Sequence, residues 1–426
     1  MLNKRFFKKA ARDALMLFSG PLTILCRFII SFVPAGAKQE VMLIAPADKG
    51  SLGDEAMLVS SIRQINQRGL KAVLVSGNGR WSEALVAYGL QFREVRGLGG
   101  YGSVTTILRM AYWLVRIRPA AVYLVGADVM DGFYNPDRTR IRLLVLHMAN
   151  ACCKDVRLLG FSFNAEPVAA VTILMRRIAG HVRLQARDPV SYERLRSHGI
   201  ACHLVADLAF MLEPEVQAGV EAVHAVEKWI EATADDSVLV AVNVNSLHTL
   251  RHGEAFRHKV SSLVGHLLVE RRCRVALVPH DDRDVGGTTD HAEATRIYES
   301  LAPDAASRCF LLPDTLRACE MKHIAGHFDL VVTGRMHYAI AAMGQSVPAL
   351  MIDYQGKQEG LAQHMGLDAK LVLLSPTASE EALCEQVDAA LDLLPSMSLT
   401  VRDSLERVRV FSELNFSGTS CSVMTS

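Results

Sequence analysis

From residue 41 onward, short apolar runs rich in β-branched residues alternate with longer stretches of helical periodicity. The runs expected to be strands are residues 41–45, 72–76, 122–126, 156–161 and 182–186, then 238–245, 274–279, 310–312, 330–333 and 349–353. Continuous apolar strands separated by helices are typical of parallel sheets covered on both faces. The pattern predicts an α/β protein with two Rossmann-like, doubly wound domains that face a central cleft.

The boundary between the two domains is expected near Pro214, where the apolar pattern breaks and an Ala/Glu-rich helix over residues 212–235 begins. We therefore divide the chain into segments 1–38, 39–211, 212–398 and 399–426. The last segment has Val401, Leu405 and Val408 at helical spacing, which predicts a helix. The Ser/Thr-rich tail after Asn415 is expected to fray.

The first 38 residues differ from the rest of the chain. Five cations come first and no acid accompanies them: Lys4, Arg5, Lys8, Lys9 and Arg12. An apolar run over residues 14–34 follows, interrupted by Gly20-Pro21 and Arg27. These interruptions disfavour a spanning helix or a cleaved signal peptide. An amphipathic segment lying on an anionic membrane surface fits better.

Composition narrows the class of protein. Half of the residues are hydrophobic and 21% are charged, which is typical of folded, core-rich chains. The formal net charge is only +1, so nothing indicates a nucleic-acid partner. Nine cysteines without paired spacing predict reduced thiols. We expect a cytoplasmic protein, peripheral on the inner face of the cell membrane.

The first group of candidate site residues follows the strand expected at 41–45. Gly50 and Gly53 permit a tight turn, and the helix start after them, with Lys49 alongside, is suited to hold an anion. The order Lys-Gly-Ser departs from a Walker A loop. Asp54 stands where such folds place ligands. Glu55 is equally consistent with a carboxylate stabilised by the helix dipole.

A second group follows the strands expected at 330–333 and 349–353. Arg335 is placed to grip a phosphate or carboxylate bidentately, and His337 beside it is suited to proton transfer near neutral pH. Lys357 and Glu359 lie on the next loop at the same sheet edge. Solvated loop charge remains an alternative for these last two.

Further polar residues end other expected strands. Arg187 follows the strand at 182–186, and Asn243 and His280 are expected to form pocket walls. His323 and His327 have the i, i+4 spacing of metal ligands, but no acidic partner is evident in the sequence. We therefore expect no metal site and read this pair as part of a helix surface.

Together these motifs resemble the polysaccharide pyruvyl transferase family over about residues 41–367. The matching stretches are Gly53-Asp54-Glu55-Ala56, Arg187-Asp188-x-x-Ser191, Pro279-His280, Gly334-Arg335-Met336-His337 and Asp353-Tyr354-x-x-Lys357-x-x-Gly360. Residues 126–132 depart from the family, because relatives usually have a run of glycines there.

The resemblance implies a GT-B-like fold and transfer of the enolpyruvyl carbon of phosphoenolpyruvate to two hydroxyls of one sugar. The product is a ketal, and phosphate is released. The implied partners are phosphoenolpyruvate and a glycan or lipid-linked sugar, with no cofactor and no metal. We expect His337 to act as acid and Asp54 as base, with Arg187, Arg335 and Lys357 binding the anionic donor.

Two other functions remain open. One is a GT-B glycosyltransferase that uses a nucleotide sugar, in which Glu359 would bind the ribose. The other is a membrane-bound glycan-binding protein without catalysis, whose function would survive the loss of His337. Release of phosphate rather than a nucleoside diphosphate distinguishes the first of these from pyruvyl transfer.

Overall fold

The computed structural model describes residues 39–77, 79–97, 104–216, 221–232, 237–353 and 356–417, together with residue 24. The segment 1–38 that we expect to bind membranes lies outside these ranges, apart from that single residue. Within the described part of the chain, no helix has both the length and the apolar character needed to cross a membrane.

The chain divides into two compact units. The first contains Met1–Lys49, Leu58–Val205 and Asn415–Ser426, and the second contains Gly50–Met57 and Ala206–Leu414. The main part of the second unit begins at Ala206, a few residues before the expected division after residue 211. It also takes in the short segment from Gly50, because the Gly50 carbonyl accepts a hydrogen bond from the Asp282 amide at 3.0 Å. Ser51 forms an antiparallel bridge with Asp281.

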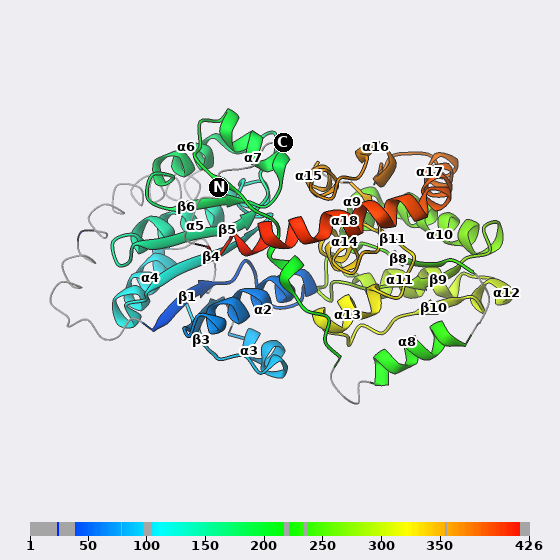
Figure 1. The fold of residues 1–426 in the computed structure, drawn as a ribbon, viewed down its shortest axis with the longest axis horizontal. Helices are drawn as coiled ribbons and strands as arrows, with labels where there is room; N and C mark the ends of the chain where they lie inside the picture. Colours follow the sequence, from blue (N-terminus) through cyan, green and yellow to red (C-terminus); the bar gives the residue numbers. More distant parts are fainter. Residues whose placement is uncertain are drawn as a thin grey trace, which may run out of the picture. The chain divides into compact units, whose positions relative to one another are not determined.

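The first unit is built on a parallel sheet of seven strands in the order β3-β2-β1-β4-β5-β6-β7. Helices surround this sheet (Figure 1). The strands are β1 (Glu40–Ile44), β2 (Lys71–Ser76), β3 (Phe92–Arg96), β4 (Ala121–Ala127), β5 (Asp155–Phe161), β6 (Arg183–Ala186) and β7 (His203–Leu204). The helices are α2 (Leu52–Gln67), whose first turn as far as Met57 belongs to the second unit, α3 (Trp81–Leu85), α4 (Val104–Ile117), α5 (Pro136–Ala149), α6 (Ala169–Ile178) and α7 (Pro189–Ser197).

The second unit repeats this plan with six parallel strands in the order β10-β9-β8-β11-β12-β13. They are β8 (Leu239–Asn243), β9 (Arg274–Leu277), β10 (Cys309–Leu311), β11 (Leu330–Thr333), β12 (Ala349–Ile352) and β13 (Leu373–Leu374). The helices are α8 (Glu221–Glu231), α9 (Ser246–His252), α10 (Glu254–Val269), α11 (Asp290–Glu299), α12 (Pro303–Ala306), α13 (Ala318–Ala325), α14 (Met336–Met343), α15 (Gln358–His364), α16 (Ala369–Val372), α17 (Glu380–Asp392) and α18 (Leu394–Glu413).

These strand orders confirm the prediction of two doubly wound, Rossmann-like units. In each sheet the chain runs outward in one direction and then restarts beside its first strand, so the order reverses between β1 and β4 and between β8 and β11. Folds of this type bind ligands beyond the carboxyl ends of the strands at that reversal. In the second unit, the residues that follow β8 and β11 are therefore the first place to look for a site.

The structure contains three strands that the hydrophobic pattern did not predict. β3 has the sequence Phe-Arg-Glu-Val-Arg and lies at the edge of its sheet, where only Val95 is buried. β7 and β13 are two residues long and are also edge strands. An edge strand pairs along one side only, so it needs neither the length nor the continuous apolar run of a central strand.

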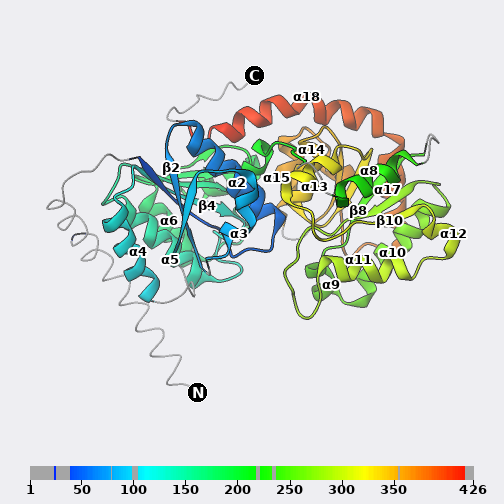
Figure 2. The ribbon, with the colours of Figure 1, turned by 90° about the horizontal axis from the view of Figure 1, so that it is seen from below.

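The described residues near the end of the chain form a long helix and a short buried segment, and the remainder of the tail that is expected to fray lies outside the described residues. α18 begins at Leu394, earlier than predicted, and packs against α14 in the second unit (Figure 2). Two residues that follow α18, Asn415 and Phe416, are buried in the first unit. The carbonyls of Asn415 and Ser417 accept hydrogen bonds from Arg157 at 2.9 and 3.0 Å.

Candidate functional site

Polar side chains gather at the carboxyl edge of the second sheet, where the strand order reverses. Asn243 ends β8, and its amide nitrogen donates to the Val278 carbonyl beyond β9 at 2.8 Å. Its amide oxygen accepts from the Thr333 hydroxyl at the end of β11 at 3.0 Å. Asn243 therefore joins three strand ends and is itself buried, which gives it a structural role.

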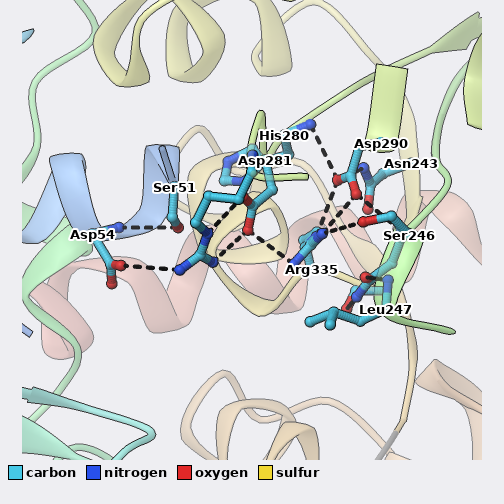
Figure 3. A network of polar contacts seen from close by, with 12 residues as sticks. Ser51, Asp54, Asn243, Ser246, Leu247, His280, Asp281, Asp290 and Arg335 are labelled. Carbon is cyan, nitrogen blue, oxygen red and sulfur yellow. Dashed lines mark hydrogen bonds and ion pairs between the residues drawn. The ribbon is translucent and has the colours of Figure 1, made fainter. Parts of the chain in front are cut away.

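Arg335 caps the start of α14 and lies between two carboxylates. Its Nε and Nη2 donate to Asp290 at 3.0 and 2.6 Å, and its Nη1 lies 3.0 Å from Asp281 (Figure 3). Burial by itself lowers the pKa of Arg335, but Asp290 and Asp281 outweigh burial and raise that pKa. This geometry does not support the expected bidentate grip on a substrate anion, because both edges of the guanidinium hold protein carboxylates.

A second arginine, Arg283, extends this network toward the start of α2. It donates to Asp281 from Nε at 2.8 Å, and its Nη1 lies 3.8 Å from Asp54. The contacts thus alternate in charge from Asp54 through Arg283, Asp281 and Arg335 to Asp290 (Figure 3). The Arg283 side chain is 40% exposed, compared with 10% for Arg335. Arg283 is therefore the more accessible of the two guanidinium groups.

Sequence reasoning missed Arg283 as a site residue. It follows directly on the His280-Asp281-Asp282 run that ends the β9 segment, and this proximity was the available signal. The approach of Arg283 also requires a glycine at position 50. Gly50 has φ +133°, and a Cβ there would lie 2.5 Å from the Arg283 Cγ.

His337 lies in the first turn of α14 with its ring directly against the backbone of Gly53. A Cβ at Gly53 would lie 2.3 Å from the His337 Nδ1, so only glycine leaves room for this ring. The imidazole Nε2 is buried and makes no hydrogen bond within the described residues. It lies 3.6 Å from the Asp207 Oδ2. The structure thus pairs His337 with a carboxylate that the sequence did not identify.

Asp207 is oriented by the short helix that it begins. Its Oδ1 accepts from the Ala209 amide at 2.9 Å as the N-cap of the 3₁₀ helix Leu208–Met211. The Ser412 hydroxyl of α18 donates to the Asp207 carbonyl at 2.6 Å. Because the backbone and one carboxylate oxygen are held, the other oxygen is fixed on the side that His337 occupies.

His280 lies in the same unit as His337, and its imidazole is buried. Burial lowers the pKa of His280 to about 3, and the nearby His337 and Arg335 lower it further. Its ring packs against Tyr338, with the ring centroids 5.3 Å apart. His280 is therefore neutral across the physiological range, so it is unsuited to deliver a proton near neutral pH.

The remaining expected residues of this unit lie at the same sheet edge. Lys357 is buried at the N-cap of α15, and Glu359 is exposed in the first turn of that helix. The Glu55 carboxylate accepts from the Ala318 amide at 3.1 Å, at the start of α13. Glu55 therefore caps the start of α13, a structural role that differs from the expected stabilisation by the dipole of its own helix.

Arg187 and Lys49 belong to the first unit. Arg187 is buried after β6, and its Nε donates to the Ser162 hydroxyl at 2.7 Å. Burial raises the pKa of its neighbour Asp188, which caps α7 through the Ser191 amide at 2.7 Å. Lys49 is 39% exposed and lies 3.7 Å from Glu83.

Residues 126–132, where relatives usually have a run of glycines, begin with a backbone turn at Ala127. Ala127 ends β4 with φ +50°, a left-handed conformation in which glycine is favoured. Gly126 beside it is required by packing, because a Cβ there would lie 2.5 Å from the Phe161 Cβ. The backbone thus retains a turn suited to glycine although the residue is alanine.

Comparison with known proteins places this geometry in context. The sequence matches the family "Polysaccharide pyruvyl transferase" over residues 52–356. Similar solved structures include a putative UDP-N-acetylglucosamine 2-epimerase from Listeria monocytogenes, with TM-score 0.58 and 14% identity, covering 90% of this chain and 98% of that one.

Two further structures show the same fold. A UDP-GlcNAc 2-epimerase from Neisseria meningitidis bound to UDP-GlcNAc has TM-score 0.56 and 10% identity, covering 88% of this chain and 98% of that one. A glycosyltransferase from Rickettsia africae ESF-5 has TM-score 0.55 and 10% identity, covering 90% and 100%. At such identities the likeness extends to the fold alone.

Proposed function

The chain belongs to the polysaccharide pyruvyl transferase family, and we propose that it transfers the pyruvyl group of phosphoenolpyruvate to two hydroxyls of a sugar in a polysaccharide or lipid-linked glycan. The observation that carries this proposal is the placement of His337. Its ring packs on Gly53, and its Nε2 lies 3.6 Å from Asp207 at the sheet edge where such folds bind ligands.

The proposed reaction adds two hydroxyl oxygens to one carbon. The C3 methylene of phosphoenolpyruvate takes up a proton and becomes a methyl group, while two sugar oxygens bond to C2. The bond from C2 to the phosphate oxygen breaks, and inorganic phosphate leaves. Two hydroxyl protons are released, one of which balances the proton on C3 while the other leaves with phosphate.

In this proposal His337 supplies the proton to C3, since a positioned imidazole is an effective acid near neutral pH. The neighbouring carboxylate of Asp207 compensates the positive charge of the imidazolium. Asp54, which lies 3.8 Å from Arg283, is proposed to orient or deprotonate an acceptor hydroxyl.

The donor anion requires cations, and the contacts of Arg335 change which cation we propose. Arg335 already holds Asp281 and Asp290, so we assign it the role of positioning the strand ends. Arg283 also holds Asp281, through Nε and Nη2, but its side chain is 40% exposed, so Arg283 is proposed to contact the phosphate or carboxylate of phosphoenolpyruvate. Lys357 remains a proposed donor ligand from the next strand end of the same unit, and the expected role of Arg187 in the first unit stays a prediction.

The decisive experiment combines purified protein, phosphoenolpyruvate and candidate lipid-linked sugars. We expect phosphate release with a ketal on the glycan, identified by mass spectrometry. The His337→Gln variant should bind phosphoenolpyruvate nearly normally in calorimetry while its turnover falls by roughly 10²–10⁴-fold. Lost binding would make His337 a donor ligand, and near-normal turnover would remove it from the mechanism.

The same assay tests the alternative of a glycosyltransferase that uses a nucleotide sugar. Nucleotide sugars replace phosphoenolpyruvate in a parallel reaction, and release of the nucleoside diphosphate is measured. Diphosphate release that depends on Glu359, without phosphate release from phosphoenolpyruvate, would replace our proposal with glycosyl transfer.

A further inference from the structure

Helices α8 and α13 of the second unit pack against each other and bring three potential metal ligands together (Figures 1 and 2). Glu227 of α8 lies beside His323 of α13 and beside His327, which follows that helix. One ligand atom of each lies within 4.8 Å of the ligand atoms of the other two. The histidine pair that had no acidic partner in the sequence thus acquires one from a helix about a hundred residues earlier.

The distances within this cluster approach those of a metal site. The two imidazole Nε2 atoms are 3.4 Å apart. Two nitrogens bound to one tetrahedral Zn²⁺ at about 2.0–2.1 Å are separated by about 3.3–3.4 Å. The Glu227 Oε1 lies 2.9 Å from the His323 Nε2 and needs to move outward by only a few tenths of an ångström. Its side chain is 30% exposed, which leaves room for that movement.

No single placement of protons makes both contacts of the His323 Nε2 ordinary two-centre hydrogen bonds. If the His323 Nε2 carries its proton toward Glu227, it has no lone pair left to accept from His327. If the His323 Nε2 instead accepts from His327, it has no proton to donate to Glu227, so this nitrogen and the carboxylate oxygen face each other as two acceptors. A cation between the atoms satisfies all of them at once.

We propose that Glu227, His323 and His327 bind a divalent transition metal of the Zn²⁺ class and thereby tie α8 to α13. Two imidazoles and one carboxylate form a three-ligand set that suits Zn²⁺, Co²⁺ and Ni²⁺ better than Mg²⁺ or Ca²⁺. The cluster is partly exposed, so the metal can enter from solvent and water can complete its coordination. This site is independent of the proposed transfer reaction.

The test uses the full chain after chelation and dialysis, titrated with Co²⁺ and Zn²⁺ and followed by absorbance and calorimetry. We expect one equivalent of metal, a tetrahedral Co²⁺ spectrum and a higher thermal midpoint with Zn²⁺. A near-ultraviolet thiolate-to-cobalt band would assign the metal to cysteines and overturn the proposal.

Matched variants separate the cluster from general surface charge. His327→Gln and Glu227→Gln should each weaken binding at least tenfold and abolish the thermal shift. Glu231→Gln removes an exposed carboxylate one turn further along α8, and His258→Gln removes an exposed histidine from α10. Each of these controls should change affinity less than threefold. Equal losses in Glu231→Gln and Glu227→Gln, or the absence of any binding, would refute the assigned ligand set.

Discussion

Replacing Gly53 with alanine tests whether the contact between this residue and the His337 ring positions the proposed acid. Gly53 is the second residue of α2, and its φ is not positive, so its backbone accepts alanine without strain. The added Cβ would lie 2.3 Å from the His337 Nδ1, 2.4 Å from its Cγ and 2.7 Å from its Cβ. Favourable carbon contacts begin at about 3.5 Å, so the ring must move by about 1 Å.

The expected effects on activity and stability differ in size. A displacement of about 1 Å at a reacting group lowers turnover by roughly 10²-fold. Overpacking costs about 1–3 kcal/mol, whereas alanine in a helix contributes about 0.5–1 kcal/mol of stability relative to glycine. We therefore expect Gly53→Ala to lose most of its phosphate release while its stability falls by no more than about 2 kcal/mol.

Two comparisons isolate the contact. Gly265→Ala places a methyl group at a helix position with nothing within 4 Å, so it should stabilise α10 slightly and leave turnover unchanged. In a His337→Gly background the ring and its Cβ are gone, so Gly53→Ala should become stabilising by about 0.5–1 kcal/mol. Thermal unfolding of the four combinations measures this coupling.

The reasoning would be refuted by either of two results. Gly53→Ala with wild-type turnover would show that the ring position is not limiting. An equal change in unfolding midpoint with and without the His337 side chain would show that the two residues do not share the contact seen here.

Three further predictions follow from the network and from the chain's start. Asp290→Asn should destabilise the protein by about 3 kcal/mol, because Arg335 loses one of two buried partners. Burial alone would raise the pKa of Asp290, but Arg335 outweighs burial and lowers that pKa. The stability that the Asp290 carboxylate contributes is therefore complete above about pH 3.9 and is lost as the pH falls through the lowered pKa. Acid unfolding curves of Asp290→Asn should lack this loss of stability. Arg335→Lys should lower both the unfolding midpoint and the turnover, since a lysine does not bridge Asp281 and Asp290. Arg283→Lys should instead raise the KM for phosphoenolpyruvate with little change in the unfolding midpoint. The opposite pattern would restore Arg335 as the donor ligand. Anionic vesicles should sediment the full chain at low salt more than a chain that begins at Lys38, and equal sedimentation would exclude the segment 1–38 as a membrane anchor.

The sequence by itself was sufficient to predict the two doubly wound units and the sheet edge that carries the candidate site. Ten of the thirteen strands in the described residues were recognisable, among them all nine central ones, since a strand buried on both faces must be continuously apolar. The residues after those strands were equally recognisable, because parallel strands place their carboxyl ends along one edge. This reasoning placed His337, Arg335, Asn243 and His280 at that edge, although it did not give their roles. Edge strands such as β3 carry no such constraint and were missed.

Only the tertiary structure decided which charged groups meet. Arg335 and Asp290 are 45 residues apart, and His323 and Glu227 are 96 apart, so no local pattern links either pair. The partner of a charge determines its chemistry. The structure places Arg335 between two carboxylates, which is why we propose a positioning role for it, and it places the Asp207 carboxylate beside His337. Apolar burial is encoded by residue type along a strand. Electrostatic pairing acts over a few ångströms, so it depends on the packing that brings distant segments together.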